Sequence, residues 1–179
     1  GARPIWPSTP FALQSYESPT WCVRPINSAI EQGVGFAWVE HCDLSDATLF
    51  FRAIPTGGGN VVLQSASDTT YCVHPWGGSV GDNVRLVWHA DCTTGTAAWQ
   101  VTQLAVGSQF VLQSAADSAY CVQPNGGAIA AGVRLYWHSD CSTTDSALQF
   151  IATERTASPP PLLPPWLPPS PPRPSSPPP

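Results

Sequence analysis

Short apolar or alternating runs, separated by turn residues, fill most of the first 156 positions of the chain. The clearest set of four runs covers residues 110–113, 119–122, 133–137 and 147–151. Clusters of Gly, Asn, Asp and Ser, such as residues 125–127, separate these runs, as expected for strands joined by tight turns. No stretch keeps the 3.6-residue period of an amphipathic helix. The pattern therefore predicts an all-β fold of short strands.

The same pattern occurs three times, at offsets of 50 and then 49 residues. Each copy has Leu-Gln-Ser, then an aromatic-Cys-Val-x-Pro segment, a tryptophan and a second cysteine, and the copies start at Leu13, Leu63 and Leu112. A period of this length indicates a repeat architecture. Four strands in each of three repeats make twelve, the number in a β-trefoil, whereas three four-stranded blades are too few for a propeller. We expect a β-trefoil domain over residues 11–156.

The six cysteines share this regularity, because the two in each repeat are separated by 20 residues. An even number of periodic cysteines without Cys-x-x-Cys pairs indicates a disulfide framework formed in an oxidising compartment. Of 15 possible connectivities, two respect the repeat symmetry, one within repeats and one linking each repeat to the next. We favour the within-repeat pairing, because the second and third strands of one repeat are neighbours in a trefoil. The expected bridges are Cys22–Cys42, Cys72–Cys92 and Cys121–Cys141.

Composition narrows the possible partners. The chain contains no Lys, its charged residues amount to 11%, and its net charge is −5. No basic cluster is available to neutralise phosphates, so we expect no nucleic-acid partner. No apolar run approaches the roughly 18 residues that span a bilayer. Six cysteines in a chain that does not start with Met lead us to expect a secreted product whose signal peptide has been removed.

The two ends differ from the repeats. Residues 1–10 place Ile5 and Trp6 among prolines and predict a short extended arm. Residues 157–179 form a proline-rich tail that can join neither sheet nor helix. A polyproline II conformation would extend its last 21 residues over roughly 65 Å.

Two stretches carry a resemblance to known trefoils. Residues 63–74 (Leu-Gln-Ser…Tyr-Cys-Val-His) and residues 46–48 (Asp-Ala-Thr) resemble the arabinose-binding β-trefoil family that is often appended to arabinofuranosidases. The repeats also resemble ricin-type lectin trefoils. The first resemblance implies that a His after the Tyr-Cys strand and the Asp of the Asp-Ala-Thr motif hold a sugar. The matching residues are His74, Asp46 and Asp145.

No repeat keeps both members of that pair. Thr96 replaces the Asp in repeat two, while Arg24 and Gln123 replace the His in repeats one and three. The Gln-x-Trp signature of ricin-type lectins is absent, and Trp99 alone stands at its place.

The tail is similar to the hydroxyproline-rich glycoproteins of green algal and plant cell walls, through its Ser-Pro and Pro-Pro-Pro runs. That resemblance implies secretion, prolyl hydroxylation and covalent O-glycans. The prolines concerned are Pro159, Pro160, Pro161, Pro164, Pro165, Pro168, Pro169, Pro171, Pro172, Pro174, Pro177, Pro178 and Pro179.

Candidate chemistry for an enzyme is sparse. The pattern Trp-His-x-Asp-Cys places His89 with Asp91 and His138 with Asp140, where a metal pair or an oriented base is conceivable. Because the pattern recurs in two repeats, we interpret it as turn structure. No nucleophile elbow is present, and no paired carboxylates for glycoside hydrolysis can be identified. We expect no enzyme activity, no cofactor and no metal.

The tryptophans that recur in each repeat, Trp38, Trp88 and Trp137, have two interpretations. Recurrence favours a core or rim layer, whereas exposed indole rings would serve as three sugar-stacking platforms.

Two functional hypotheses follow. The first is a structural glycoprotein of an extracellular matrix, cell wall or cell-surface filament, which assembles with copies of itself. Its expected anchors are large apolar side chains of the tail and the arm, which are Leu162, Leu163, Trp166, Leu167, Ile5 and Trp6. The second is a carbohydrate-binding, lectin-like module whose tail is a linker or anchor. Cell-wall polysaccharide is a possible partner in either case.

Overall fold

Each repeat folds into four strands because its apolar residues alternate with polar ones and its turns hold Gly, Asn or Asp. The structure, a computed structural model, describes residues 6–156. Repeat one contains β1 (Phe11–Ser15), β2 (Trp21–Pro25), β3 (Phe36–Glu40) and β4 (Phe50–Gly57). Repeat two contains β5 (Asn60–Ser65), β6 (Cys72–Pro75), β7 (Val84–His89) and β8 (Val101–Val106). Repeat three contains β9 (Gln109–Ser114), β10 (Cys121–Pro124), β11 (Leu135–His138) and β12 (Gln149–Glu154).

Short 3-10 helices occupy two equivalent places in each repeat of the described chain. One follows the second strand, as η1 (Ile26–Ser28), η3 (Trp76–Gly78) and η5 (Asn125–Gly127). The other precedes the fourth strand, as η2 (Ala47–Leu49), η4 (Ala97–Trp99) and η6 (Ser146–Leu148). The prediction of an all-β fold of twelve antiparallel strands in three repeats is confirmed.

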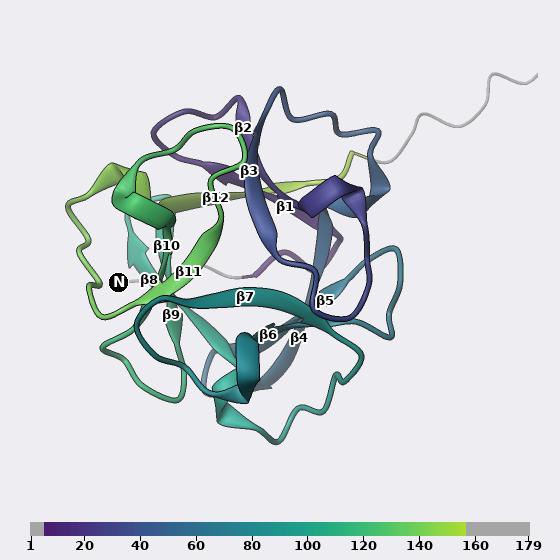
Figure 1. The fold of residues 1–179 in the computed structure, drawn as a ribbon, viewed down its shortest axis with the longest axis vertical. Helices are drawn as coiled ribbons and strands as arrows, with labels where there is room; N and C mark the ends of the chain where they lie inside the picture. Colours follow the sequence, from purple (N-terminus) through teal and green to yellow (C-terminus); the bar gives the residue numbers. More distant parts are fainter. Residues whose placement is uncertain (1–5, 157–179) are drawn as a thin grey trace, which may run out of the picture.

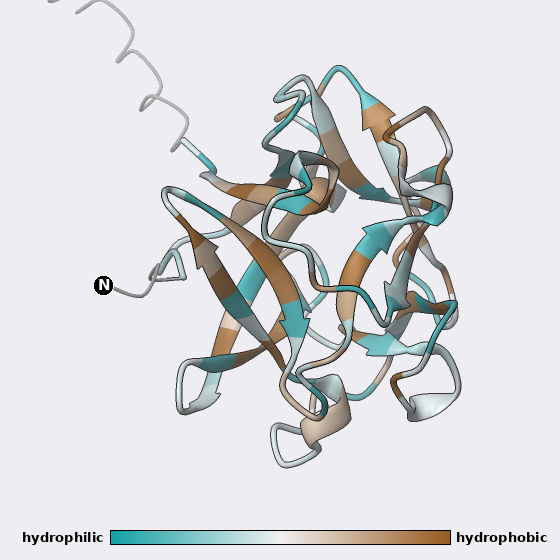
Figure 2. Ribbon diagram, turned by 90° about the vertical axis from the view of Figure 1, so that its left-hand side faces the viewer, coloured by the Kyte–Doolittle hydropathy of each residue, from teal (hydrophilic) through white to brown (hydrophobic). Residues whose placement is uncertain are grey.

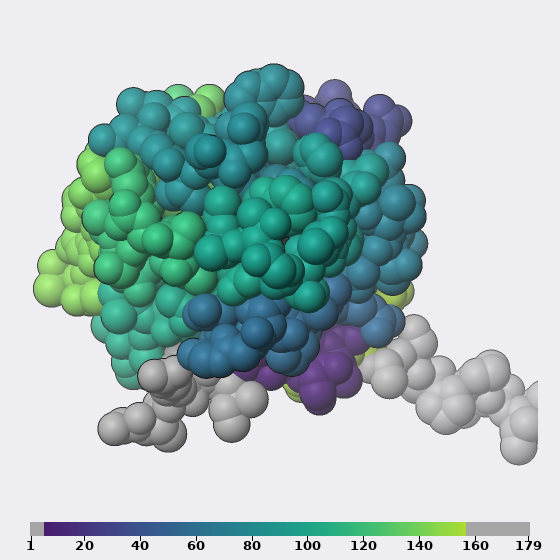
Figure 3. Space-filling view, turned by 90° about the horizontal axis from the view of Figure 1, so that it is seen from below, coloured from purple at the N-terminus to yellow at the C-terminus, as the bar shows by residue number. Residues whose placement is uncertain are grey.

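The first and fourth strands of the repeats form a closed barrel. Its successive antiparallel neighbours are β1, β4, β5, β8, β9 and β12, and β12 returns to β1. The closing pair aligns Phe11 with Glu154, and the Arg155 amide donates a hydrogen bond of 2.8 Å to the Pro10 carbonyl. The first and last strands of the described chain are therefore neighbours, and Figure 3 shows yellow atoms beside the purple ones at its lower edge.

The second and third strands form three hairpins, β2–β3, β6–β7 and β10–β11. In Figure 1 the strands β3, β7 and β11 lie around the pseudo-threefold axis at the front of the barrel. Neighbouring hairpins contact each other through antiparallel backbone pairing. Examples are the pairing of Trp137 with Val84 and the bridge between Ala37 and Arg134. The hairpins are therefore positioned by one another as well as by the barrel.

Apolar side chains from the strands fill the interior, and Figure 2 shows the hydrophobic colour concentrated along strands. Trp38, Trp88 and Trp137 belong to this core, with exposed fractions of 0%, 0% and 2%. Their indole faces cannot stack on a sugar, which corrects that part of the expected binding site. The core interpretation, favoured by recurrence, holds instead.

Each hairpin carries one disulfide. The bonds join Cys22 to Cys42, Cys72 to Cys92 and Cys121 to Cys141, with Cα–Cα distances of 5.4, 5.3 and 5.2 Å. The within-repeat pairing is confirmed. Three disulfides indicate an extracellular or secreted protein.

The N-terminal arm packs on its own domain. The Trp6 ring lies 5.7 Å from that of Phe11 and 5.6 Å from that of Phe110, measured between centroids. Trp6 is thus a partly buried residue at the edge of the core, and its expected role as an assembly anchor stays a prediction. Ile5 and the whole tail, with its apolar anchors and prolines, lie outside the described residues.

Candidate functional site

A turn from one repeat covers the hairpin of the next, and three equivalent pocket positions lie between them. The same hydrogen bond places each turn. The amides of Gly33, Asn83 and Gly132 donate to the carbonyls of Trp88, Trp137 and Trp38, over 2.8, 2.9 and 3.0 Å. Repeat one therefore covers repeat two, repeat two covers repeat three, and repeat three covers repeat one.

The position in repeat two is an open depression of about 430 Å³, which we name the histidine pocket. His74 of β6, His89 of β7, Trp76 of η3 and Trp99 of η4 line it, and Gln32 comes from the covering turn. The pocket thus combines four rings with one amide from another repeat.

His74 is sandwiched between two of these rings. Its ring lies 4.5 Å from His89 at an interplanar angle of 3°, and 3.9 Å from Trp99 at 20°. The His74 Nε2 lies 2.6 Å from the carbonyl oxygen of Asp91. Because a carbonyl can only accept, Nε2 carries the proton and Nδ1 remains an acceptor. Stacking and hydrogen bonding together fix the orientation of this ring.

The surroundings of His74 disfavour its charged form. Burial lowers the pKa of His74, and this effect outweighs the hydrogen bond to Asp91, which acts in the opposite direction. The Thr93 hydroxyl and amide lower the pKa of Asp91, so the carboxylate is charged beside the two imidazoles. The Nδ1 of His89 is buried and has no hydrogen-bond partner among the described residues.

Trp76 forms the exposed edge of the histidine pocket, with 52% of its surface accessible. The Arg85 guanidinium lies 4.0 Å from the centre of its ring. A Cβ on Gly33 would lie 3.1 Å from the indole, and the φ of +81° at Gly33 also favours glycine. The covering turn thus approaches this indole closely because residue 33 has no side chain.

Trp99 is the residue of the histidine pocket at which repeat two differs most clearly from the other repeats. The equivalent residues of the other repeats are Leu49 and Leu148, each 1% exposed. The larger indole reaches the pocket and contacts His74. A tryptophan in one repeat, where the other two repeats have leucine, was the feature of the sequence that could have indicated this pocket. Trp76, His89 and Gln32 were not predicted as parts of a site, because their convergence depends on which turn covers which hairpin.

Asp46 and Asp145 lie in other repeats and have structural partners. The Asp46 carboxylate accepts hydrogen bonds from the Thr48 amide and hydroxyl at 2.9 and 2.7 Å, and from the Ser28 hydroxyl at 3.1 Å. Burial raises the pKa of Asp46, but these hydrogen bonds outweigh it and the pKa lies below its usual value. Asp145 accepts from the Ala147 amide at 3.0 Å. The structure does not bring His74, Asp46 and Asp145 together.

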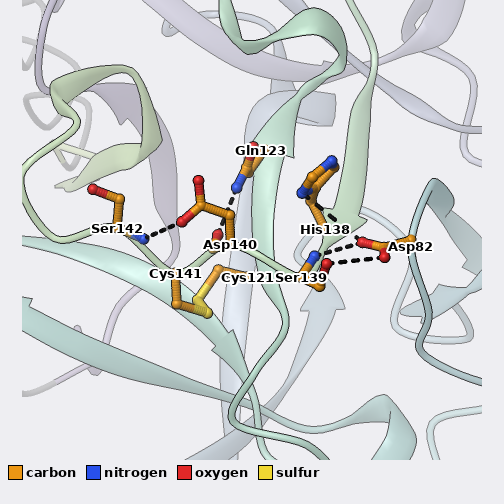
Figure 4. A network of polar contacts seen from close by, with 8 residues as sticks. All are labelled: Asp82, Cys121, Gln123, His138, Ser139, Asp140, Cys141 and Ser142. Carbon is orange, nitrogen blue, oxygen red and sulfur yellow. Dashed lines mark hydrogen bonds and ion pairs between the residues drawn. A yellow bond between two sulfur atoms is a disulfide. The ribbon is translucent and has the colours of Figure 1, made fainter.

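At the equivalent position in repeat three, polar side chains contact one another, as Figure 4 shows. The Asp82 carboxylate accepts hydrogen bonds from the Ser139 amide at 2.6 Å and from its hydroxyl at 2.9 Å. These bonds, the hydroxyl first, lower the pKa of Asp82, and His138 lies 3.9 Å away. Gln123 donates to the Asp140 carbonyl at 2.5 Å, just as His74 donates to Asp91. In both repeats the carbonyl of the residue before the second cysteine is therefore held by the hairpin.

In the recurring His and Asp pairs the aspartates hold turns, whereas His89 and His138 are the last residues of β7 and β11. Asp91 and Asp140 accept hydrogen bonds from the amides of Thr93 and Ser142. Within residues 6–156 no group of three or more His, Cys, Asp or Glu side chains could hold a metal ion. No helix of that part is long and apolar enough to cross a membrane.

Comparison with known proteins identifies the fold. No family model and no curated protein matches the chain. The designed threefold-symmetric protein ThreeFoil matches with a TM-score of 0.69 at 12% identity, over 81% of this chain and 98% of ThreeFoil. The Rhizoctonia solani agglutinin matches with a TM-score of 0.67 at 15% identity, over 86% of this chain and 99% of the agglutinin.

The exo-β-1,3-galactanase 1,3Gal43A from Clostridium thermocellum matches with a TM-score of 0.69 at 12% identity, over 84% of this chain and 31% of the enzyme. These identities show the fold alone. The chain has a β-trefoil fold that resembles the ricin-B-type lectins and ThreeFoil.

Proposed function

We propose that this chain is a carbohydrate-binding protein and that the histidine pocket is its binding site. The observation that carries the proposal is the stack of His89, His74 and Trp99 beside the exposed Trp76. Sugar rings present flat C–H faces and a rim of hydroxyls. Binding sites for small molecules are concave, largely aromatic and apolar, and carry a few oriented polar groups.

The polar groups of the pocket suit hydroxyls. The Nδ1 of His74 is left as an acceptor by the tautomer, and the Nδ1 of His89 has no protein partner within the described chain. Burial lowers the pKa of His74 and so disfavours its charged form, which suits a neutral sugar. The resemblance to arabinose-binding trefoils and the fold shared with a galactanase make arabinose and galactose the first sugars to test.

The proposal concerns binding and not catalysis. Self-assembly through the tail, hydroxylated prolines and a place in a matrix or wall all concern residues 157–179, outside the described residues. They stay predictions, separate from the proposed sugar site.

The first test is titration of the full chain with arabinose and with galactose, followed by amide chemical shifts. We expect one of these sugars to shift signals of residues 74–78 and 89. Trp99→Leu introduces the residue that repeats one and three already carry, so the fold should persist. It removes one ring of the stack, and we expect binding to weaken roughly two- to tenfold, since aromatic contacts of this kind contribute about 0.5–1.5 kcal/mol beyond their buried area.

Tyr16→Ala is the matched control, because Tyr16 is an exposed aromatic residue, at 41%, that does not line the histidine pocket. It should leave binding unchanged. Binding that survives Trp99→Leu and also Trp76→Ala would show that the sugar binds elsewhere.

A further inference from the structure

Repeat one has its own depression at the equivalent position, with different chemistry. Its volume is about 340 Å³, and we name it the arginine pocket. Arg24 of β2, Glu40 of β3 and Asn27 of η1 line one side, and Ala131 and Arg134 come from repeat three. The two arginines thus come from the first and the last repeat of the chain.

The covering turn of this pocket differs from the other two turns at one residue. Gln32 and Asp82 stand at the corresponding places of the other two turns and accept hydrogen bonds from the amides of Ala90 and Ser139, at 2.8 and 2.6 Å. Ala131 occupies that place above the hairpin of repeat one. A methyl group cannot span the gap or accept a hydrogen bond, so neither arginine faces a carboxylate from the turn.

The arginines of this pocket have no ionic partner in the part of the chain that the structure describes. Between residues 6 and 156, the only contact within 4.0 Å between side chains that can carry opposite charges is that of His138 with Asp82. Arg24 lowers the pKa of Asp46, but the Asp46 oxygens are already bonded to Thr48 and Ser28. The Nε of Arg24 is buried without a hydrogen-bond partner in the described chain. Such an unsatisfied donor is costly unless a ligand accepts from it.

The geometry points to an acidic sugar as the ligand, and we propose that the arginine pocket binds the carboxylate of a uronic acid. Guanidinium groups bind carboxylates through paired, charge-assisted hydrogen bonds. Glu40 can accept hydrogen bonds from sugar hydroxyls, and Ile26 and Val39 offer apolar contact for a ring face. The proposal goes beyond the sugar site in repeat two, since it concerns another pocket and another class of ligand.

The test uses galacturonic acid, galactose and acetate as probes on the full chain, again followed by amide chemical shifts. We expect galacturonic acid to shift signals of Asn27, Ala131 and Gly132. Galactose and acetate at equal concentration should leave these three signals unmoved. Shifts confined to the histidine pocket with galactose would support the other site independently, so the two proposals can fail separately.

Variants identify the groups responsible. Arg24→Gln and Arg134→Gln should each weaken galacturonate binding roughly tenfold or more, as expected for a hydrogen bond to a charged group. Arg52→Gln removes the same charge from an exposed residue of β4 that does not line this pocket, and binding should be unchanged. A loss with Arg52→Gln equal to that with Arg134→Gln would mean general charge attraction and would overturn the proposal.

Ala131→Asp tests the pocket without removing either arginine. It places a carboxylate where Asp82 lies in the adjacent turn, and this group should compete with the ligand for the guanidinium groups. We expect binding to be lost while the unfolding temperature stays near that of the parent chain. Galacturonate that binds no better than galactose or acetate, or that binds undiminished to Ala131→Asp, contradicts the proposal.

Discussion

His74 and Gln123 occupy the same position in successive repeats and make the same contact, a hydrogen bond to the carbonyl that precedes the second cysteine. The sequence pattern identified His74 as a sugar ligand by resemblance, and the structure adds that it also holds the disulfide loop. His74 differs from Gln123 in that its side chain can take up a proton and stacks on neighbouring rings. The motif alone did not show this structural role of His74, and its role as a sugar ligand stays a prediction.

This comparison predicts the effect of His74→Gln on stability. The pKa of His74 in the folded protein lies below the ordinary 6.5, mainly because of burial. The unfolded chain therefore takes up this proton more readily, and the contribution of neutral His74 is lost as pH falls below about 6.5. His89 and Asp91 are the titratable groups that face the ring. We expect His74→Gln to fold and to lose less stability than the parent between about pH 7 and pH 5.

Denaturant unfolding at both pH values measures the difference. His89→Gln is the control, because it removes the neighbouring imidazole but keeps His74. If His74→Gln kept the full acid sensitivity of the parent, the buried imidazole would not be its source.

The hairpins show what the sequence could and could not predict at the level of elements. Repeat symmetry reduced the disulfide connectivities to two, and the expected trefoil, in which the second and third strands are neighbours, selected the pairing that the structure confirms. The burial of Trp38, Trp88 and Trp137 was only one of two interpretations, because a strand alternates its faces whichever face meets the core. The contents of the pockets could not be predicted, since each depends on a turn about 40 or more residues away along the chain.

Removal of one disulfide should therefore have a local and a global effect. Replacing both Cys72 and Cys92 by Ala opens a loop closed by residues 20 apart and should cost about 3 kcal/mol of unfolding free energy. The Asp91 carbonyl that holds His74 lies next to Cys92, so sugar binding in the histidine pocket should weaken as well.

The paired replacement of Cys121 and Cys141 is the matched control. It should cost a similar free energy of unfolding in denaturant titrations and leave sugar binding intact. Equal losses of binding in the two variants would show that the disulfide acts only through overall stability.

At the scale of the whole molecule, the barrel closes without the tail. The last strand, β12, ends at Glu154, and the final backbone hydrogen bond of the described chain joins Arg155 to Pro10. We predict that deleting residues 157–179 leaves the unfolding temperature unchanged. If the tail drives assembly, the truncated chain stays monomeric in sedimentation while the full chain forms filaments, and Trp166→Ala weakens assembly more than Arg173→Ala. Filaments formed by the truncated chain would exclude the tail as the assembly element.

A ligand in the arginine pocket would connect the first and the last repeat of the closed barrel. Arg24 belongs to the first repeat and Arg134 to the last, so a ligand held by both bridges the seam where the chain meets itself. Opening of that seam would first require the ligand to leave, and a ligand that binds only the closed form lowers the population of the open form. Amides along β1 and β12 should then exchange with solvent more slowly when the pocket is filled, because local opening of this strand pair becomes rarer.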